Sequence, residues 1–493
     1  MKDNIHVLFI SSEIAPFAKT GGLADVSGAL PQYLADERIN ICLLMPLYGS
    51  IDQKRFNIKP YDNKTYTLKA GNINIDYEIS ICKLPGTEID VFFLKNDSFY
   101  KRESLYVNPA NGRDWEDNVE RYLLLSKASL EIINHINFMP NILHINDWQT
   151  SLVPLYLMEK SKKHPSYKEI KTLLSIHNIA YQGIFEIEKF DYLGLPEEHI
   201  KFGGALEFWG RMNILKAGIF YSDLLTTVSK TYAMEIQKSE EFGYGLEGIL
   251  TERRDDLHGV LNGIDYNVWN PLIDEHIQIN YGIESLHGKK ENKKLLLRSI
   301  NMKYDDKIPL IGFISRLVDQ KGIDLIQDRI YELMELDLQF IILGTGERKY
   351  HNFFQEVQKM YPEKVAVFLE FNNKLAHQIE ASCDIFLMPS KYEPCGLNQM
   401  YSLKYGTVPI VRNTGGLADT VKDFDPVTKR GNGFVFESYD SAELLKTVKR
   451  AINNYKKSDI WQIIVENGMV ADFSWRKSAI EYIKLYRKLM QVS

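Results

Sequence analysis

The sequence predicts an α/β protein with two doubly wound domains, and three observations support this fold class. The chain has 493 residues, more than one ordinary core holds, because domains run about 100–200 residues. Short apolar runs followed by polar loops alternate with helical patterns, which is typical of parallel sheets. The same alternation starts again after the segment 259–271, GVLNGIDYNVWNP.

The first half supplies five predicted strands, each almost continuously apolar and followed by a polar loop. They are Ile5–Ser12, Ile41–Pro46, Ile142–Asp147, Lys171–Asn178 and Asp223–Ser229. Between them, GLADVSGALPQYLAD (residues 22–36) reads as a helix up to its internal Pro31, and NVERYLLLSKASLEIINH (residues 118–135) reads as another.

The second half repeats the pattern with five further predicted strands: Pro309–Arg316, Leu338–Gly346, Val365–Phe371, Asp384–Ser390 and Val408–Asn413. The last segment, WRKSAIEYIKLYRKLM, places Ala479, Ile483, Tyr486 and Met490 on one helical face. We therefore expect a first domain at residues 1–260, a second at 261–472, and a final helix at 473–493 that returns to the first domain.

Composition excludes several classes of function. The net charge is −6, so no global basic field would recruit nucleic acid or an anionic membrane. The lysine runs HGKKENKK and EKSKKH are expected to be solvated loops. No apolar run approaches the about 18 residues that span a bilayer, and the start is a poor signal peptide. The four cysteines form no C-x-x-C pair, which favours reduced thiols and a cytoplasmic protein.

The six residues T-G-G-L-A-D occur twice, at Thr20–Asp25 and at Thr414–Asp419. Each copy follows a predicted strand and opens a predicted helix. Glycines there let the backbone approach a ligand closely, and a helix start offers N–H groups that suit phosphate. Ligands of doubly wound sheets bind at the carboxyl ends of the strands. The two copies could face one cleft from both sides, although ordinary turn chemistry could produce the same motif.

Charged side chains also follow the predicted strands. Arg316 and Lys321 lie five residues apart in a polar loop, where a guanidinium fork and a compact ammonium could neutralise a diphosphate. An ion pair with a neighbouring helix is the plainer interpretation. Glu393 precedes Pro394 and therefore lies in a loop. His144 and His177 end strands of the first half, where a histidine is more often structural than catalytic.

Motifs that bind other cofactors are incomplete or absent in the sequence. The segment LGTGERK has two glycines of a dinucleotide-binding fingerprint, but Lys349 replaces the third glycine. The chain contains neither a G-x-x-x-x-G-K-[ST] phosphate loop nor a G-x-S-x-G nucleophile elbow. No group of His, Cys and carboxylates has metal-ligand spacing, so we expect no metal and no cofactor.

The motifs KTGGLADV, HNIAYQG, YGLEG, VLNGID, SR followed by QKG, and EPCGL with KYGT and TGGLADTV occur in this order between Ile5 and Trp475. Because these motifs occur in this order, the chain resembles the bacterial glycogen synthase and plant starch synthase family. That family consists of retaining glucosyltransferases of the GT-B fold, in which two Rossmann-like domains face an interdomain cleft. The resemblance covers nearly the whole chain.

The resemblance implies roles for residues of the first domain. Lys19 and the backbone of Gly21 and Gly22 would lie beside the phosphates and sugar of the donor, with Asp25 in the same motif. Asp147, His177 and Asn178 would line the glucose pocket. Asn262 would lie near the interdomain hinge. Tyr100 and Asp117 match the family more loosely.

In the second domain the resemblance implies that Arg316 and Lys321 hold the diphosphate. Glu393 and the backbone of the next motif residues would grip the glucose hydroxyls, and the second T-G-G would contact phosphate. These residues are Cys395, Gly396 and Leu397 for the hydroxyls, and Thr414, Gly415 and Gly416 for the phosphate. Lys19, His177, Arg316, Lys321 and Glu393 are thus the candidate catalytic residues.

Three residues depart from the family pattern, and a fourth, Tyr401, differs from the wider fold. Asn398 follows EPCGL where Thr is common, and Val318–Asp319 replaces a Thr and a small or polar residue. Tyr401 stands where retaining relatives in the wider fold carry a second Glu. The starch and glycogen branch also lacks that Glu, so Tyr401 supports this branch.

The implied reaction transfers glucose from a nucleotide sugar to the non-reducing end of an α-1,4-glucan with retention of configuration. The K-x-G-G-L form resembles enzymes that use ADP-glucose, so ADP-glucose and glucans such as glycogen or maltooligosaccharides are the expected partners. Two alternatives remain. A twin-domain phosphorylase or sugar-nucleotide epimerase would be another enzyme, and a non-catalytic glucan-binding protein would bind without chain growth.

Overall fold

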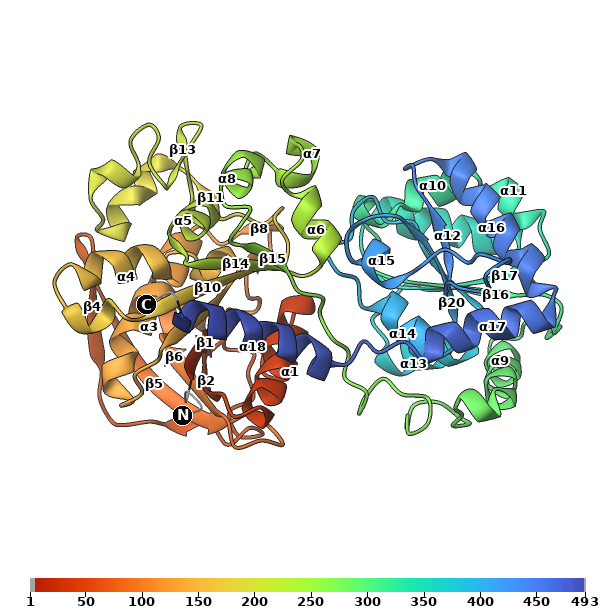
Figure 1. The fold of residues 1–493 in the computed structure, drawn as a ribbon, viewed down its shortest axis with the longest axis horizontal. Coiled ribbons are helices and arrows are strands. Elements are labelled where there is room, and N and C mark those ends of the chain that lie inside the picture. Colours follow the sequence, from red (N-terminus) through yellow and green to blue (C-terminus); the bar gives the residue numbers. More distant parts are fainter. Residues whose placement is uncertain (1–4, 492–493) are drawn as a thin grey trace. The chain divides into compact units, whose positions relative to one another are not determined.

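The computed structural model describes residues 5–491. Within this range the chain divides into two compact units. The first comprises residues 5–228, 233–263 and 475–491, and the second comprises residues 229–232 and 264–474. Each unit contains a mainly parallel sheet covered by helices (Figure 1). The predicted α/β class with two doubly wound halves is therefore confirmed.

The ten-stranded sheet of the first unit has the order β15-β14-β10-β9-β1-β2-β6-β5-β3, with β4 beside β5. The strands from β15 to β6 are parallel. Five of them are the predicted strands: β1 (His6–Ile10), β2 (Asn40–Pro46), β9 (Ile142–Asn146), β10 (Lys171–Ile176) and β14 (Leu224–Thr227). The sequence analysis missed β15 (Leu257–Gly259), β6 (Asp90–Lys95) and the antiparallel strands β3 (Lys59–Pro60), β4 (Tyr66–Ala70) and β5 (Ile73–Lys83).

Helix α1 (Gly22–Asp36) corrects one expectation, because it continues through Pro31. Proline removes one backbone N–H from a helix and usually kinks or ends it. Here both Ser27, four residues earlier, and Pro31 are buried. Helix α1 packs against α18 (Trp475–Gln491), and most of the stability of a helix in a protein comes from such tertiary packing. Helix α3 (Asn118–His135) has the predicted bounds.

Helix α18 belongs to the first unit, although it comes from the end of the chain. Its predicted apolar face is buried at Ala479, Ile483 and Tyr486. The Tyr486 hydroxyl lies 2.7 Å from Nδ1 of the buried His144 on β9, and His144 Nε2 lies 2.7 Å from Ser175 Oγ on β10. His144 is thus a structural histidine that ties the last helix to two neighbouring strands.

The second unit contains a six-stranded parallel sheet in the order β18-β17-β16-β19-β20-β21. All five predicted strands are present: β16 (Leu310–Ile314), β17 (Gln339–Leu343), β18 (Val365–Phe368), β19 (Ile385–Met388) and β20 (Val408–Arg412). β21 (Phe434–Phe436) was not predicted. The helices around the sheet are α9 (His287–Ser299), α10 (Ile323–Asp328), α11 (Ile330–Met334), α12 (Arg348–Met360), α13 (Asn373–Ser382), α14 (Asn398–Lys404), α15 (Gly415–Thr420), α16 (Ser441–Tyr455) and α17 (Ser458–Met469).

The lysine run HGKKENKK was wrongly expected to be a loop, because it opens α9. Lys289 and Lys293 are buried, and their ammonium groups contact acceptors of the core. Lys293 Nζ lies 2.7 Å from Asp384 Oδ2, and Lys289 Nζ lies 2.7 Å from Thr407 Oγ1. Burial lowers the pKa of Lys289 to about 8. The four-residue spacing of the two lysines puts them on one helix face, which the composition of the run concealed.

No helix between residues 5 and 491 combines the length and the apolar character needed to cross a membrane. The four cysteines are free and buried.

The His144 contact predicts the effect of Tyr486→Phe. Removing the hydroxyl leaves the buried His144 Nδ1 without its partner, which typically costs about 1–3 kcal/mol. We expect the melting temperature of the first unit to fall by several degrees in a calorimetric scan. The matched control is Ile480→Ala on the same helix, where the side chain is 42% exposed. Equal melting temperatures for both variants would contradict the anchoring role of His144.

Candidate functional site

The second unit brings its predicted site residues together at the carboxyl ends of β16 and β19, which are neighbours in the sheet. The loop after β16 carries Arg316 and Lys321, and the loop after β19 carries Glu393. Together they line a cavity of about 150 Å³. The other lining residues are Phe313, Ile314, Ser315, Leu387, Met388, Ser390, Gly396, Leu397 and Asn398. This is the edge at which doubly wound sheets bind ligands.

Lys321 and Glu393 form an ion pair inside this cavity. Lys321 Nζ lies 2.6 Å from Glu393 Oε2, and the two side chains are only 16% and 9% exposed. Ser390 Oγ donates a second hydrogen bond to the same carboxylate oxygen over 3.0 Å. The expected alternative, an ion pair with a neighbouring helix, does not describe Lys321, because its partner is another predicted site residue. Arg316 is exposed and lines the same cavity.

The second T-G-G packs against the loop that carries Glu393. Thr414, Gly415 and Gly416 are all buried. Gly416 N donates to Glu393 O, and a Cβ atom at Gly416 would lie 2.0 Å from Cys395 O. Gly415 has φ +45°, and a Cβ atom there would lie 2.0 Å from Glu393 O. These glycines thus allow two backbone segments to touch, and a contact with phosphate stays a prediction.

The structure shows the contacts made by the residues that differ from the family or from the wider fold. The amide of Asn398 donates 2.7 Å to the carbonyl of Ile314, which ties the start of α14 to the end of β16. The ring of Tyr401 stacks on Trp269 with centroids 3.9 Å apart. Tyr401 therefore supports α14 through an aromatic contact. Asp319 pairs with Lys349 and accepts a hydrogen bond from Tyr350.

In the first unit the first T-G-G has the opposite environment. Gly21 and Gly22 are exposed, and a Cβ atom at either would meet nothing within 4 Å in the described chain. Lys19 Nζ lies 2.6 Å from Asp25 Oδ1, with side chains 51% and 33% exposed. The start of α1 therefore has open space beside it, bordered by the Lys19–Asp25 ion pair.

Glu13 holds this loop, and the sequence analysis missed it. The Glu13 side chain is buried, and it accepts hydrogen bonds from Thr20 N, from Thr20 Oγ1 at 2.6 Å and from Tyr106 OH at 2.6 Å. The sequence did contain a signal for Glu13, namely a carboxylate in the loop between a buried strand and a helix. A buried carboxylate needs hydrogen-bond donors around it.

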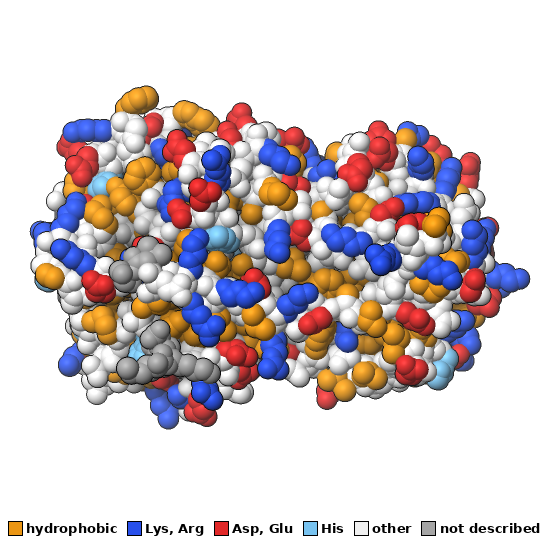
Figure 2. All heavy atoms as spheres, in the orientation of Figure 1, with side chains coloured by type: hydrophobic (Ala, Val, Ile, Leu, Met, Phe, Trp, Pro, Cys, Tyr) orange, Lys and Arg blue, Asp and Glu red, His pale blue; other side chains and the backbone are white. Residues whose placement is uncertain are grey.

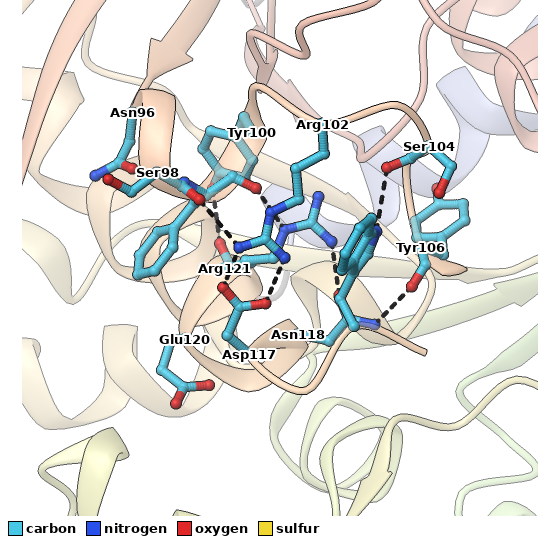
Figure 3. A network of polar contacts seen from close by, with 12 residues as sticks. Asn96, Ser98, Tyr100, Arg102, Ser104, Tyr106, Asp117, Asn118, Glu120 and Arg121 are labelled. Atoms are coloured by element: carbon cyan, nitrogen blue, oxygen red, sulfur yellow. Dashed lines mark hydrogen bonds and ion pairs between the residues drawn. The ribbon is translucent and has the colours of Figure 1, made fainter. Parts of the chain in front are cut away.

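Tyr100 and Asp117 belong to a polar network behind this loop, and Figure 3 shows both side chains pointing into it. Tyr100 is fully buried and donates 2.6 Å to Arg121 O. Asp117 binds Arg102 with both carboxylate oxygens. The network continues to the Glu13 loop, because Asn118 donates to Tyr106 O and Tyr106 donates to Glu13. Both residues therefore support the loop, and direct contact with a substrate stays a prediction.

Asp147 and His177 adjoin each other at the ends of β9 and β10. His177 N donates 2.7 Å to Asp147 Oδ1, and the backbone N–H of Asn178 bonds the same carboxylate. Burial raises the pKa of Asp147 to about 7 and lowers the pKa of His177 to about 4. His177 is therefore neutral at pH 7, with Nε2 lying 3.0 Å from Asn146 Oδ1. Asp147 has φ +54°, a strained conformation of the kind that clusters at functional sites.

Asn262 is buried just before the chain passes into the second unit, and its Oδ1 has no hydrogen-bond partner within residues 5–491. One group of metal-ligating side chains comes together in the described chain: Glu159, Glu198 and His199. None of these is a predicted site residue. Tyr221 OH lies 3.1 Å from His199 Nδ1, and Lys162 binds Glu159.

Comparisons with known proteins agree over nearly the whole chain. Residues 6–252 match the model of the starch synthase catalytic domain, and residues 299–465 match that of glycosyl transferases group 1. The glycogen synthase of Fervidobacterium nodosum is 46% identical over 98% of this chain and 99% of its own, and that of Thermotoga maritima is 43% identical over 99% of each.

Two solved structures are similar. The catalytic domain of Arabidopsis thaliana starch synthase IV, bound to ADP and acarbose, has a TM-score of 0.89 and 32% identity, over 99% of this chain and 100% of that one. Sucrose-phosphate synthase from Thermosynechococcus elongatus, at 14% identity and a TM-score of 0.59 over 99% of this chain and 100% of that one, shares the fold.

The fold and these matches define a glycosyltransferase with two Rossmann-like units. Within that class, the chain belongs to the glycogen synthase and starch synthase family.

The two glycine pairs predict opposite responses to alanine. Gly22→Ala adds a Cβ atom into open space at a helix start, so the melting temperature should be unchanged or slightly higher. Gly416→Ala puts a Cβ atom 2.0 Å from Cys395 O, and the melting temperature should fall clearly because the backbone must move. Thermal melts of both variants test this, and equal stability of the two would refute the structural difference between the copies.

Proposed function

We propose that the chain transfers glucose from ADP-glucose to the non-reducing end of an α-1,4-glucan with retention of configuration. The cavity of the second unit carries this proposal, because Arg316, Lys321 and Glu393 all line it. Two cations suit a diphosphate, and a carboxylate suits the hydroxyls of a sugar. The names of the similar proteins support the same donor and acceptor chemistry.

The charge that develops in the reaction explains the two cations. When the glycosidic bond of the donor breaks, one more oxygen of the diphosphate becomes negative. Cations already fixed beside that oxygen stabilise the transition state without reorganising. Lys321 is held by Glu393, and the same carboxylate oxygen of Glu393 accepts a hydrogen bond from Ser390. Because these side chains supply the positive charge, the proposal requires no metal.

Retention follows if the acceptor attacks the same face that the diphosphate leaves, through an oxocarbenium-like state. The departing diphosphate can take the proton of the acceptor hydroxyl, so no separate base is needed. The first unit would supply Lys19 and the open glycine backbone for the phosphates. Neutral His177, together with Asp147 and Asn178, would line the glucose pocket without adding a positive charge beside the sugar cation.

We also propose a cytoplasmic location, since free and buried thiols suit a reducing compartment. The acceptor there would be glycogen or a maltooligosaccharide.

A donor comparison tests the proposed reaction. The purified chain is incubated with a glycogen primer and labelled ADP-glucose or UDP-glucose, and kcat/KM is measured for both. ADP-glucose should be used far better, because the K-T-G-G-L loop at Lys19 has the form that resembles ADP-glucose enzymes. Equal or reversed preference would refute the donor assignment. Glucan binding without chain growth from either donor would show a binding protein instead.

Substitutions in the cavity test the mechanism. Arg316→Ala and Lys321→Ala should each lower kcat at least about a hundredfold, as the loss of one preorganised charge-stabilising group does. Lys321→Arg should restore little, since a planar fork cannot replace a compact ammonium. The control is Lys456→Ala, which removes an ion pair with Asp337 between side chains 49% and 69% exposed. Normal kcat in both alanine variants, with normal thermal melts, would remove these residues from the mechanism.

A further inference from the structure

Three side chains of the kinds that bind metal ions meet in the first unit. Glu159 lies near the end of α4 (Val153–Ser161), and Glu198 and His199 lie in the short turn η4 (Glu197–His199). His199 Nε2 lies 3.4 Å from Glu159 Oε1 and 3.9 Å from Glu198 Oε1. One ligand atom from each of the three lies within 4.8 Å of the other two. Two carboxylates and one imidazole nitrogen therefore converge on one point.

The histidine of this cluster is almost completely buried. The His199 side chain is 3% exposed, whereas those of Glu159 and Glu198 are 23% and 69% exposed. A buried imidazole must satisfy both of its nitrogens. Nδ1 lies 3.1 Å from the hydroxyl of Tyr221, at the end of α5 (Ile214–Tyr221), which packs against α4. Nε2 is thus the nitrogen that faces the two carboxylates.

The distance between His199 and Glu159 fits a metal site better than a hydrogen bond. N–H···O hydrogen bonds span about 2.7–3.2 Å, and the observed 3.4 Å lies beyond this range. In tetrahedral sites Zn²⁺ binds histidine nitrogen at about 2.0–2.1 Å and carboxylate oxygen at about 2.0–2.2 Å. Two such ligand atoms then lie about 3.3–3.5 Å apart, as Nε2 and Oε1 do. A neutral histidine that donates to Glu159 is the plainer interpretation, and this distance speaks against it.

The Tyr221 hydroxyl supplies a further feature of a metal-binding histidine. Such a histidine almost always donates its other ring N–H to a neighbouring oxygen, which fixes the tautomer and the orientation of the ring. The Tyr221 oxygen occupies this position beside Nδ1, and the two rings meet edge to face with centroids 5.8 Å apart. The His199 carbonyl also accepts a hydrogen bond from Leu206 N over 2.8 Å. Contacts outside the two carboxylates therefore orient both the ring and the backbone of His199.

Basic side chains lie close to the acidic ones in this part of the first unit. On the face that Figure 2 shows, Lys and Arg are mixed with Asp and Glu around α4 and α5. Lys162 Nζ lies 2.7 Å from Glu159 Oε1, the same oxygen that faces His199. The Lys162 side chain is 53% exposed, and an exposed ion pair of this kind is weak. Lys162 is thus a displaceable competitor for the oxygen that a cation would bind.

We propose that Glu159, Glu198 and His199 bind one Zn²⁺ ion, with water as the fourth ligand. One imidazole nitrogen and two carboxylates suit Zn²⁺, whereas Mg²⁺ and Ca²⁺ prefer shells of six or more oxygens. The ion joins the end of α4 to the turn η4 and so stabilises the first unit. Its three ligands match no metal motif in the sequence, and only the fold brings them together. None of them is a candidate catalytic or substrate-binding residue, so the zinc site is independent of the proposed function.

Zinc binding by the purified full chain tests the site. The chain is treated with EDTA, the chelator is removed, and the dissociation constant of Zn²⁺ is measured by competition with a zinc-binding dye. Glu198→Gln should weaken binding at least about tenfold, because even the partners behind a metal ligand are worth about 10–100-fold. The Glu198 side chain is largely exposed, so this variant should fold normally. The matched control is Glu197→Gln, which removes the neighbouring, 79% exposed carboxylate and should bind Zn²⁺ as the wild type does.

Lys162→Ala should change the affinity in the opposite direction. Removing the competing ammonium should tighten Zn²⁺ binding about two- to fivefold, the range that an exposed ion pair is worth. Lys163→Ala removes the same charge from the next residue, which is also exposed, and should leave the dissociation constant unchanged. A histidine that only hydrogen-bonds Glu159 predicts no such gain.

Thermal melts complete the test, and they need no turnover. Zn²⁺ should raise the melting temperature of the wild-type chain and not that of His199→Gln, whereas Mg²⁺ at the same concentration should raise neither. Absence of Zn²⁺ binding by the wild-type chain would overturn the proposal. Equal affinity of the wild type, Glu198→Gln and His199→Gln would overturn it too, as would weaker binding by Lys162→Ala. Glucan synthesis that stops in EDTA and returns with Zn²⁺ would show a catalytic metal and contradict a structural site.

Discussion

The ion pair between Lys321 and Glu393 is the interaction on which the cavity of the second unit depends. It joins the loop after β16 to the loop after β19. Removing two nearly buried charges from water is costly, and their attraction often only balances that cost. Such a pair is therefore weak evidence for stability. It is better explained by the position of its charges, since it holds an ammonium and a carboxylate at the carboxyl ends of neighbouring strands.

Backbone contacts also hold together the two loops that the ion pair joins. Lys391 N donates to Gln320 O, and Gln320 Nε2 donates to Tyr392 O. Gly322 has φ +70° and lies so close to Pro389 O that a Cβ atom would be 2.0 Å away. The two loops therefore touch at several points, which restricts the shape of the cavity that they line. Preorganisation of this kind lowers the cost of binding and of charge stabilisation.

The sequence predicted the parallel strands well, because buried strands are continuously apolar and end in polar loops. It placed Arg316, Lys321 and Glu393 in loops after predicted strands, and the family resemblance supplied the expectation that they share one site. It failed where tertiary contacts override local rules. Helix α1 continues through Pro31 and packs against α18. Lys293 of α9 binds Asp384, which is distant in the sequence, and Glu13 accepts a hydrogen bond from Tyr106, 93 residues away.

The repeated T-G-G-L-A-D shows how far identical residues can differ in physical role. In the first copy Gly21 and Gly22 face open space, and a flexible glycine backbone must be fixed by something else. Glu13 fixes it, and the network behind Glu13 ends in the fully buried Tyr100. In the second copy the glycines themselves fix a neighbouring loop by direct backbone contact. One copy therefore needs glycine for access and the other for packing, and only the surrounding structure distinguishes the two.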